Sequence, residues 1–145
     1  MADMQVFTLE AANALVPKLN VMVREQLLRR AEIESRLKSL SEMAGDVPED
    51  LSPEEGDAEP VRAMKTELVA RITQYQDAWK EVELLGAVVK DPRVGLVDFY
   101  GKVDGQSVWL CWKYGEPEIG HYHALDEGFS ARRPIRHSIR QRLLN

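Results

Sequence analysis

The sequence predicts an α+β fold, in which an antiparallel helical hairpin packs against a small antiparallel β-meander. Two long segments, residues 8–43 and 60–86, carry apolar residues at three- and four-residue steps and indicate the hairpin. After Gly86 the apolar spacing shortens from about 3.6 to about 2 residues, which is typical of strands. A chain of 145 residues is expected to form a single domain with one core.

The first helical segment begins at Thr8, a favourable N-cap residue that is followed by an acid in the first turn. Pro17 lacks the amide hydrogen that a helix interior needs, so it predicts either a kink or a new helix that begins near it. Beyond Pro17 an apolar stripe follows one helix face: Leu19, Val23, Leu27, Ile33, Leu37 and Leu40. The segment is therefore expected to be a long amphipathic helix.

Residues 44–59 are expected to form a mobile loop, because they combine acids, glycines and prolines with few apolar residues. Pro60 suits the first turn of the second helix, and Gly86 ends it. The apolar stripe of this helix consists of Val61, Met64, Leu68, Ile72, Tyr75, Trp79 and Val82. Two helices of similar length joined by one loop are expected to pack antiparallel, with both stripes in their shared core.

Residues 87–125 are expected to form a three- or four-stranded antiparallel meander, because short β-type segments alternate there with turn residues. The candidate strands are residues 87–89, 96–100, 107–113 and 118–124. Residues 126–145 form a basic tail. A short helix can begin there at Pro134, because apolar residues recur at every fourth position beyond it.

Two histidines, His121 and His123, alternate along the last candidate strand and therefore point to the same side of the sheet. A four-residue turn before this strand pairs Leu110 with His121 and Val108 with His123, which places both histidines on the apolar face. A three-residue turn shifts the register by one residue and brings Cys111 beside them, but it sets the apolar residues opposite polar partners. The sequence favours the first register, and with it a pair of neutral, hydrogen-bonded histidines.

A metal site is the alternative use of these histidines, because two imidazoles on one strand face can bind one ion together. The alternative ligand set is Glu116, His121, His123 and Asp126, with a divalent metal such as zinc. Such a site would make the chain a metal-binding protein or a small metal-dependent enzyme, with Arg132 holding an anionic substrate.

Other chemistries have less support. Cys111 is the only cysteine, which excludes an internal disulfide and a multi-cysteine zinc site. Its place in the middle of a strand predicts an inert buried thiol. The sequence contains no GxSxG, GxxxxGK[ST] or GxGxxG motif, so neither a nucleophile elbow nor a phosphate-binding glycine loop is expected.

Charge and hydropathy bear on partners and location. The net charge of −5 disfavours nucleic-acid binding, although residues 128–145 contain five arginines and no acid. No apolar run approaches the roughly 20 residues that cross a bilayer. The N-terminus does not follow the order of a secretory signal, so we expect a cytoplasmic protein without membrane contact.

Several short elements stand out along the chain: Phe7-Thr8-Leu9-Glu10-Ala11-Ala12, Leu15-Val16-Pro17, Lys90-Asp91, Gly95-Leu96-Val97-Asp98-Phe99, Leu110-Cys111-Trp112, Gly115-Glu116, His123, Gly128-Phe129, Arg132 and Pro134. Together they resemble the sequence elements of the bacterial family called domain of unknown function 2203. An aromatic residue is common in the family where this chain has His121, which weakens the case for a shared metal pair. The resemblance implies no assigned activity. It does imply a shared polar surface, formed by Asp98, Glu116, His123 and Arg132.

The sequence therefore favours a non-catalytic binding or assembly domain without a cofactor over an enzyme. The β-region would present the polar recognition surface named above. The helices would supply a scaffold and the seam of a homo-oligomer, or a contact for an unknown protein partner.

Overall fold

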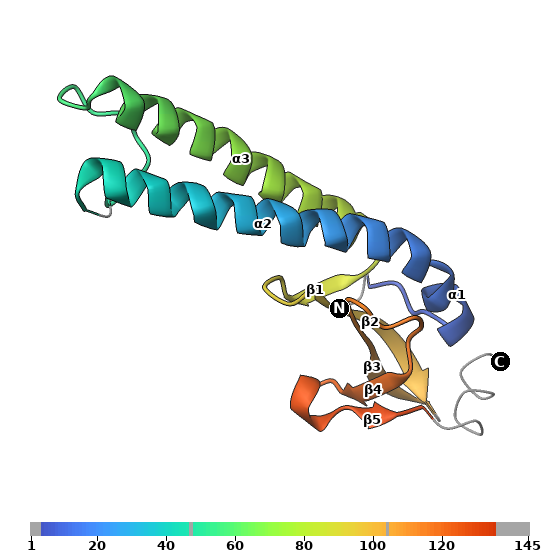
Figure 1. Ribbon diagram of the computed structural model, residues 1–145. Helices are drawn as coiled ribbons and strands as arrows, with labels where there is room; N and C mark the ends of the chain where they lie inside the picture. Colours follow the sequence, from blue (N-terminus) through green and yellow to red (C-terminus); the bar gives the residue numbers. More distant parts are fainter. Residues whose placement is uncertain (1–3, 47, 104, 136–145) are drawn as a thin grey trace.

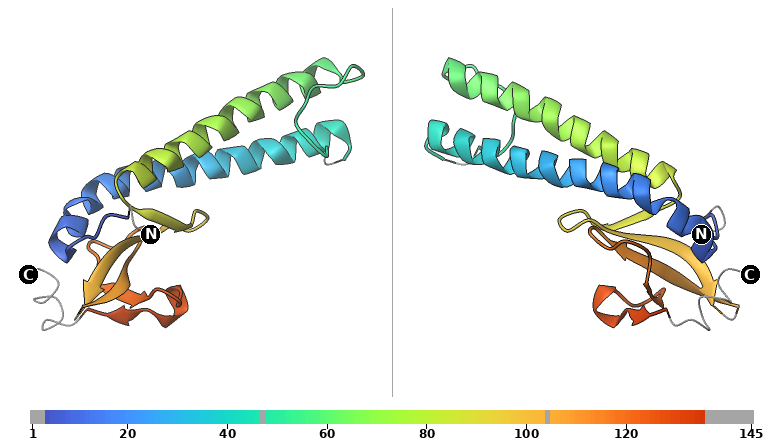
Figure 2. Two further views of the ribbon diagram at one scale, coloured as in Figure 1. Left: turned by 180° about the vertical axis from the view of Figure 1, so that it is seen from behind. Right: turned by 45° about the vertical axis from the view of Figure 1, so that its right-hand side comes forward.

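The computed structural model describes residues 4–46, 48–103 and 105–135. A pair of long helices lies over one face of a five-stranded sheet and extends well beyond it (Figures 1 and 2). The predicted α+β fold, a helical hairpin packed against an antiparallel meander, is confirmed. Within the described residues, no helix is long and apolar enough to cross a membrane.

The first predicted helical segment is divided into two helices. Helix α1 spans Leu9–Ala14, and the Oγ1 of Thr8 caps it by accepting a hydrogen bond from the amide of Ala11 at 3.0 Å. Helix α2 spans Val16–Ala44 and has Pro17 in its first turn. A new helix therefore begins near Pro17, which is one of the two predicted outcomes. Amides in the first turn of a helix make no intrahelical hydrogen bond, so a proline there costs none.

The hairpin consists of α2 and α3, which spans Glu59–Leu84. The half that extends beyond the sheet has a small core of its own, formed by Ile33, Leu40, Val61 and Leu68. The apolar stripes therefore meet largely as predicted. Leu37 is an exception, because 40% of it is exposed.

A buried lysine ties the acidic connection between α2 and α3 to the hairpin. The Nζ of Lys65 lies 3.0 Å from the Oδ2 of Asp57 and donates a hydrogen bond to the carbonyl of Ser52 at 3.2 Å. Lys65 is only 3% exposed. The described residues of this connection form neither helix nor strand, yet they are anchored at these points.

The sheet has five strands in the order β1-β2-β3-β4-β5, and each neighbouring pair is antiparallel. Their bounds are Val88–Asp91, Leu96–Val103, Gln106–Lys113, His121–Ala124 and Arg133–Pro134. A short 3-10 helix, Phe129–Ala131, precedes β5. Pro134 therefore ends a strand instead of starting a helix, and residues 136–145 of the expected helix lie outside the described residues.

One face of the sheet forms the main core with the helices. On this face lie side chains that alternate along the two central strands: Val97, Phe99, Val108, Leu110 and Trp112. Leu9, Leu19 and Val82 belong to the same cluster of buried residues. The period of two along each strand places the remaining side chains on the opposite face.

The favoured register of the histidine strand is wrong. Strand β3 pairs with β4 so that Cys111 opposes His121 and Trp109 opposes His123, which is the alternative shifted by one residue. Residues 114–120 form a longer connection than either predicted turn. Within it, Ile119 leaves the strand, is fully buried and donates its amide to the Oδ1 of Asn13 at 2.7 Å. The tight four-residue turn that the prediction assumed between β3 and β4 does not form. The observed register instead occurs together with this contact between Ile119 and α1.

Candidate functional site

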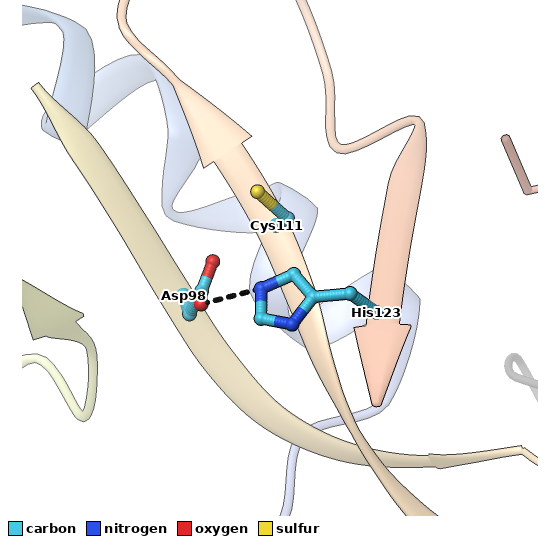
Figure 3. A group of neighbouring side chains, drawn as sticks. All are labelled: Asp98, Cys111 and His123. Carbon is cyan, nitrogen blue, oxygen red and sulfur yellow. Dashed lines mark hydrogen bonds and ion pairs between the residues drawn. The ribbon is translucent and has the colours of Figure 1, made fainter. Parts of the chain in front are cut away.

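The register of β3 and β4 gathers three chemically active side chains on the sheet face opposite the main core. Asp98 on β2 and Cys111 on β3 are directly paired, and His123 lies on the next strand, β4. Figure 3 shows the side chains of Asp98 and His123 pointing towards each other, with the side chain of Cys111 beside them. Their exposed fractions are 0% for Asp98 and Cys111 and 2% for His123, so the cluster lies inside the protein.

The hydrogen bonds of His123 show how many protons it shares with Asp98. Its Nδ1 lies 2.9 Å from the carbonyl oxygen of Ala124, and its Nε2 lies 2.9 Å from the Oδ2 of Asp98. A carbonyl oxygen can only accept, so Nδ1 carries a hydrogen. The remaining contact holds a single proton between Nε2 and Oδ2, and the pair has no net charge whichever atom carries that proton.

The electrostatics of the cluster favour its neutral forms. Burial raises the pKa of Asp98, and the opposing effects of His123 and the Cys111 thiol are smaller. Burial, with the nearby Asp98 carboxylate, also raises the pKa of Cys111 to about 12. Cys111 is therefore a thiol at neutral pH. The predicted burial of this thiol is confirmed, but its predicted separation from the histidines is wrong.

The three side chains form a group of potential metal ligands. A carboxylate oxygen of Asp98, the sulfur of Cys111 and a ring nitrogen of His123 all lie within 4.8 Å of one another. The Oδ1 of Asp98 is buried and has no hydrogen-bond partner among the described residues. Oxygen, sulfur and nitrogen donors together suit a divalent transition metal such as zinc.

A partly exposed ion pair lies beside this cluster. Arg132 donates from Nη1 and Nη2 to the two carboxylate oxygens of Glu116, at 3.1 and 2.8 Å, and its Nη1 lies 3.9 Å from the sulfur of Cys111. The guanidinium also stacks on Phe129 at 4.3 Å. Burial would raise the pKa of Glu116, but hydrogen bonds from Arg132 and from the amide of Lys113 outweigh it and hold that pKa below its usual value.

His121 belongs to the rim formed with Glu116 and Arg132. Its Nδ1 lies 3.9 Å from the Oε2 of Glu116, which is too long for a hydrogen bond. His121 and His123 therefore have different environments, although they are two residues apart on one strand. His123 is fixed by two hydrogen bonds inside the sheet face, and about a third of the His121 side chain is exposed.

The four residues of the expected recognition surface are neighbours, but only Glu116 and Arg132 reach the protein surface. Glu116 and Arg132 have side chains that are 23% and 16% exposed, whereas Asp98 and His123 are buried beneath the surface. Cys111 connects the two pairs, since it lies beside both Asp98 and Arg132. The exposed part of this group is therefore the Glu116–Arg132 ion pair.

The four residues of the alternative metal set do not form one site. Glu116 and His121 meet at the rim, His123 bonds to Asp98, and Asp126 is exposed beyond the end of β4. The sequence placed Asp98 and His123 on one expected polar surface, but it brought Cys111 beside the histidines only in the register that it did not favour, so the three residues were not predicted as one cluster. The available signal was the acid of Asp98 itself, which stands alone in an apolar strand.

Comparisons with known proteins identify the family. No curated protein and no solved structure matches the chain. The sequence profile of the family described as "Uncharacterized conserved protein (DUF2203)" matches residues 5–135. This range includes α1, both long helices and all five strands. The chain belongs to the DUF2203 family, as the resemblance of its sequence elements predicted.

Proposed function

We propose that the chain is a non-catalytic metal-binding domain, which holds one divalent transition-metal ion such as zinc through Asp98, Cys111 and His123. One observation carries the proposal: three donor atoms of suitable chemistry lie within 4.8 Å of one another in the protein interior. They come from three neighbouring strands, and a paired sheet fixes ligand positions more firmly than loops do.

Charge balance supports a divalent ion. Binding removes the thiol proton of Cys111 and the proton shared by Asp98 and His123. The thiolate and the carboxylate then contribute two negative charges, and the imidazole is neutral. A divalent cation makes the assembly neutral, which a buried position requires because an unpaired charge there is costly.

The residues around the cluster also suit this role. The Nδ1–H of His123 bonds to the carbonyl of Ala124, an arrangement that orients the other ring nitrogen of a metal-bound histidine. Arg132 lies 3.9 Å from the sulfur of Cys111 and would stabilise its thiolate. The partner of Arg132, Glu116, is the acid best placed to supply a fourth ligand, because its carboxylate and the sulfur contact the same guanidinium nitrogen.

Burial of the ligands favours retention of the ion over catalysis. The three side chains are at most 2% exposed, which leaves little access for a substrate. The ion pair of Glu116 and Arg132 at the rim of the cluster does not favour binding of a separate anion. Both terminal nitrogens of Arg132 already donate hydrogen bonds to Glu116.

Metal titration of untagged, chelator-treated protein tests the proposal. We expect one zinc ion per chain, measured by competition with a chromophoric chelator and by elemental analysis. Cobalt should give the sulfur-to-metal charge-transfer band of a thiolate ligand. Cys111→Ala and His123→Asn should each weaken zinc binding at least about tenfold.

The matched control is His121→Asn, which removes the same kind of side chain from the same strand but outside the cluster. This variant should bind zinc with unchanged affinity. Stoichiometric zinc that Cys111→Ala leaves in place would reject the proposed ligands, and failure of the folded protein to bind zinc or cobalt would reject the function.

A further inference from the structure

The carboxylate of Glu116 fills a set of hydrogen-bond donors at the rim of the proposed metal site, which we call the carboxylate cradle. Its Oε1 accepts hydrogen bonds from the Nη1 of Arg132 at 3.1 Å and from the backbone amide of Lys113 at 2.8 Å. Its Oε2 accepts one from the Nη2 of Arg132 at 2.8 Å. Such donors suit carboxylates in general, because the fork of a guanidinium matches the two oxygens of the group.

The donors of the cradle have supports other than Glu116. The guanidinium of Arg132 stacks on the ring of Phe129 at 4.3 Å, and the amide of Lys113 belongs to strand β3. The Nδ1 of His121 is buried without a hydrogen-bond partner among the described residues, 3.9 Å from the Oε2 of Glu116. The cradle would therefore keep its form if Glu116 left, and its unpaired donors would then favour another acceptor.

The proposed metal site offers Glu116 a different position. A structural zinc ion takes four ligands, and Asp98, Cys111 and His123 supply three. The carboxylate of Glu116 and the sulfur of Cys111 contact the same nitrogen of Arg132, at 3.1 and 3.9 Å, so a turn of the Glu116 side chain brings it towards the ion. An ion that gains this fourth ligand removes the carboxylate from the cradle.

We propose that metal binding opens the cradle to a small organic carboxylate from solution, which takes the place of Glu116 on Arg132 and on the amide of Lys113. The inference rests on the proposed metal site. In the metal-free protein Glu116 is an intramolecular competitor, and its high effective concentration excludes a free acid. Only 16% of the Arg132 side chain is exposed, so a small acid fits this place better than a side chain of a folded partner. The ring of Phe129, which is 40% exposed, borders it with an apolar surface.

An acetate titration of metal-free protein, followed by NMR at the amide of Lys113, tests the cradle. Glu116→Ala removes the competitor and should bind acetate at least about tenfold more tightly than the wild type. Adding Arg132→Met should remove this gain. The matched control is Glu127→Ala, which frees Arg133 from an ion pair outside the cradle and should bind acetate like the wild type. A Glu116→Ala variant that binds acetate no better than the wild type overturns the proposal.

The same titration of zinc-loaded wild type tests the coupling to metal. Acetate should bind about tenfold more tightly than to the metal-free protein, and by reciprocity acetate should tighten zinc binding by the same factor. Arg132→Met should show no such increase, which excludes acetate bound directly to the ion. A wild type that holds one zinc ion per chain and binds acetate with unchanged affinity overturns the proposal but leaves the metal site intact. Failure to bind zinc rejects the metal site and the coupling with it, whereas the metal-free titration of Glu116→Ala judges the cradle independently of metal.

Discussion

The imidazole of His123 and the carboxylate of Asp98 hold one proton between them, with Nε2 and Oδ2 2.9 Å apart inside the sheet face. The other ring nitrogen of His123 already donates to a backbone carbonyl. A metal ion at the proposed site would have to replace this proton, together with that of the neighbouring Cys111. The proposal therefore predicts that metal binding depends on pH, and the buried pair itself makes stability depend on pH.

Zinc affinity is expected to increase with pH. The pKa of Cys111 is raised to about 12 by burial, so its thiol must lose a proton on binding, and the Asp98–His123 pair loses a second one. The apparent association constant should therefore rise by up to about a hundredfold per pH unit near neutrality. Calorimetry in buffers of different ionisation enthalpy counts the released protons. Release of none would contradict ligation by the thiolate.

The buried carboxylate should make the metal-free protein less stable as the pH rises. Burial raises the pKa of Asp98 above that of the unfolded chain, so its contribution to stability is fully present below the unfolded pKa. That contribution is lost as the pH increases through the raised value. Asp98→Asn keeps a hydrogen-bonding amide at this place but cannot titrate.

Urea unfolding between about pH 4 and pH 8 compares the two proteins. The free energy of unfolding of the wild type should fall relative to that of Asp98→Asn as the pH increases. A constant difference between the two proteins over this range would show that Asp98 has the same pKa in both states.

The Glu116–Arg132 ion pair has the opposite pH dependence. Hydrogen bonds from Arg132 hold the pKa of Glu116 below its usual value, so the stabilisation is present above the unfolded pKa and lost as the pH falls through the folded one. Arg132→Met should lower the free energy of unfolding by about 1 kcal/mol at pH 7. The loss should shrink in acid, where Glu116 is protonated. An equal loss in acid would instead indicate the packing of Arg132 on Phe129.

The two histidines of β4 should differ strongly in their contribution to stability. His123→Asn removes two hydrogen bonds at a position that is 2% exposed, and it leaves Asp98 buried without its partner. A loss of about 2–4 kcal/mol is expected. His121→Asn should cost less than about 1 kcal/mol, because the Nδ1 of His121 has no hydrogen-bond partner among the described residues. Thermal unfolding of both variants measures these losses of stability. Equal losses in the two variants would contradict the prediction.

Local sequence signals were sufficient for most of the secondary structure. The cap at Thr8, the break at Pro17 and the apolar stripes depend on chemistry within a few residues, and the structure agrees with each. The apolar stripes of the two helices could not show which of their residues are buried in the hairpin core. Leu37 has the right period but is 40% exposed, because burial depends on what the other helix places opposite it.

The sequence by itself determined the α+β class, the hairpin and the presence of Asp98, Cys111, His123 and Arg132 in the β-region. Only the tertiary structure decided that Asp98, Cys111 and His123 meet. A one-residue shift moves a whole strand to the other face, and cross-strand pairing alone favoured the wrong register. The observed register occurs with the bond from Ile119 to Asn13, a residue 106 positions away in the chain. No local pattern contains such a contact, since it depends on how α1 packs beside the sheet.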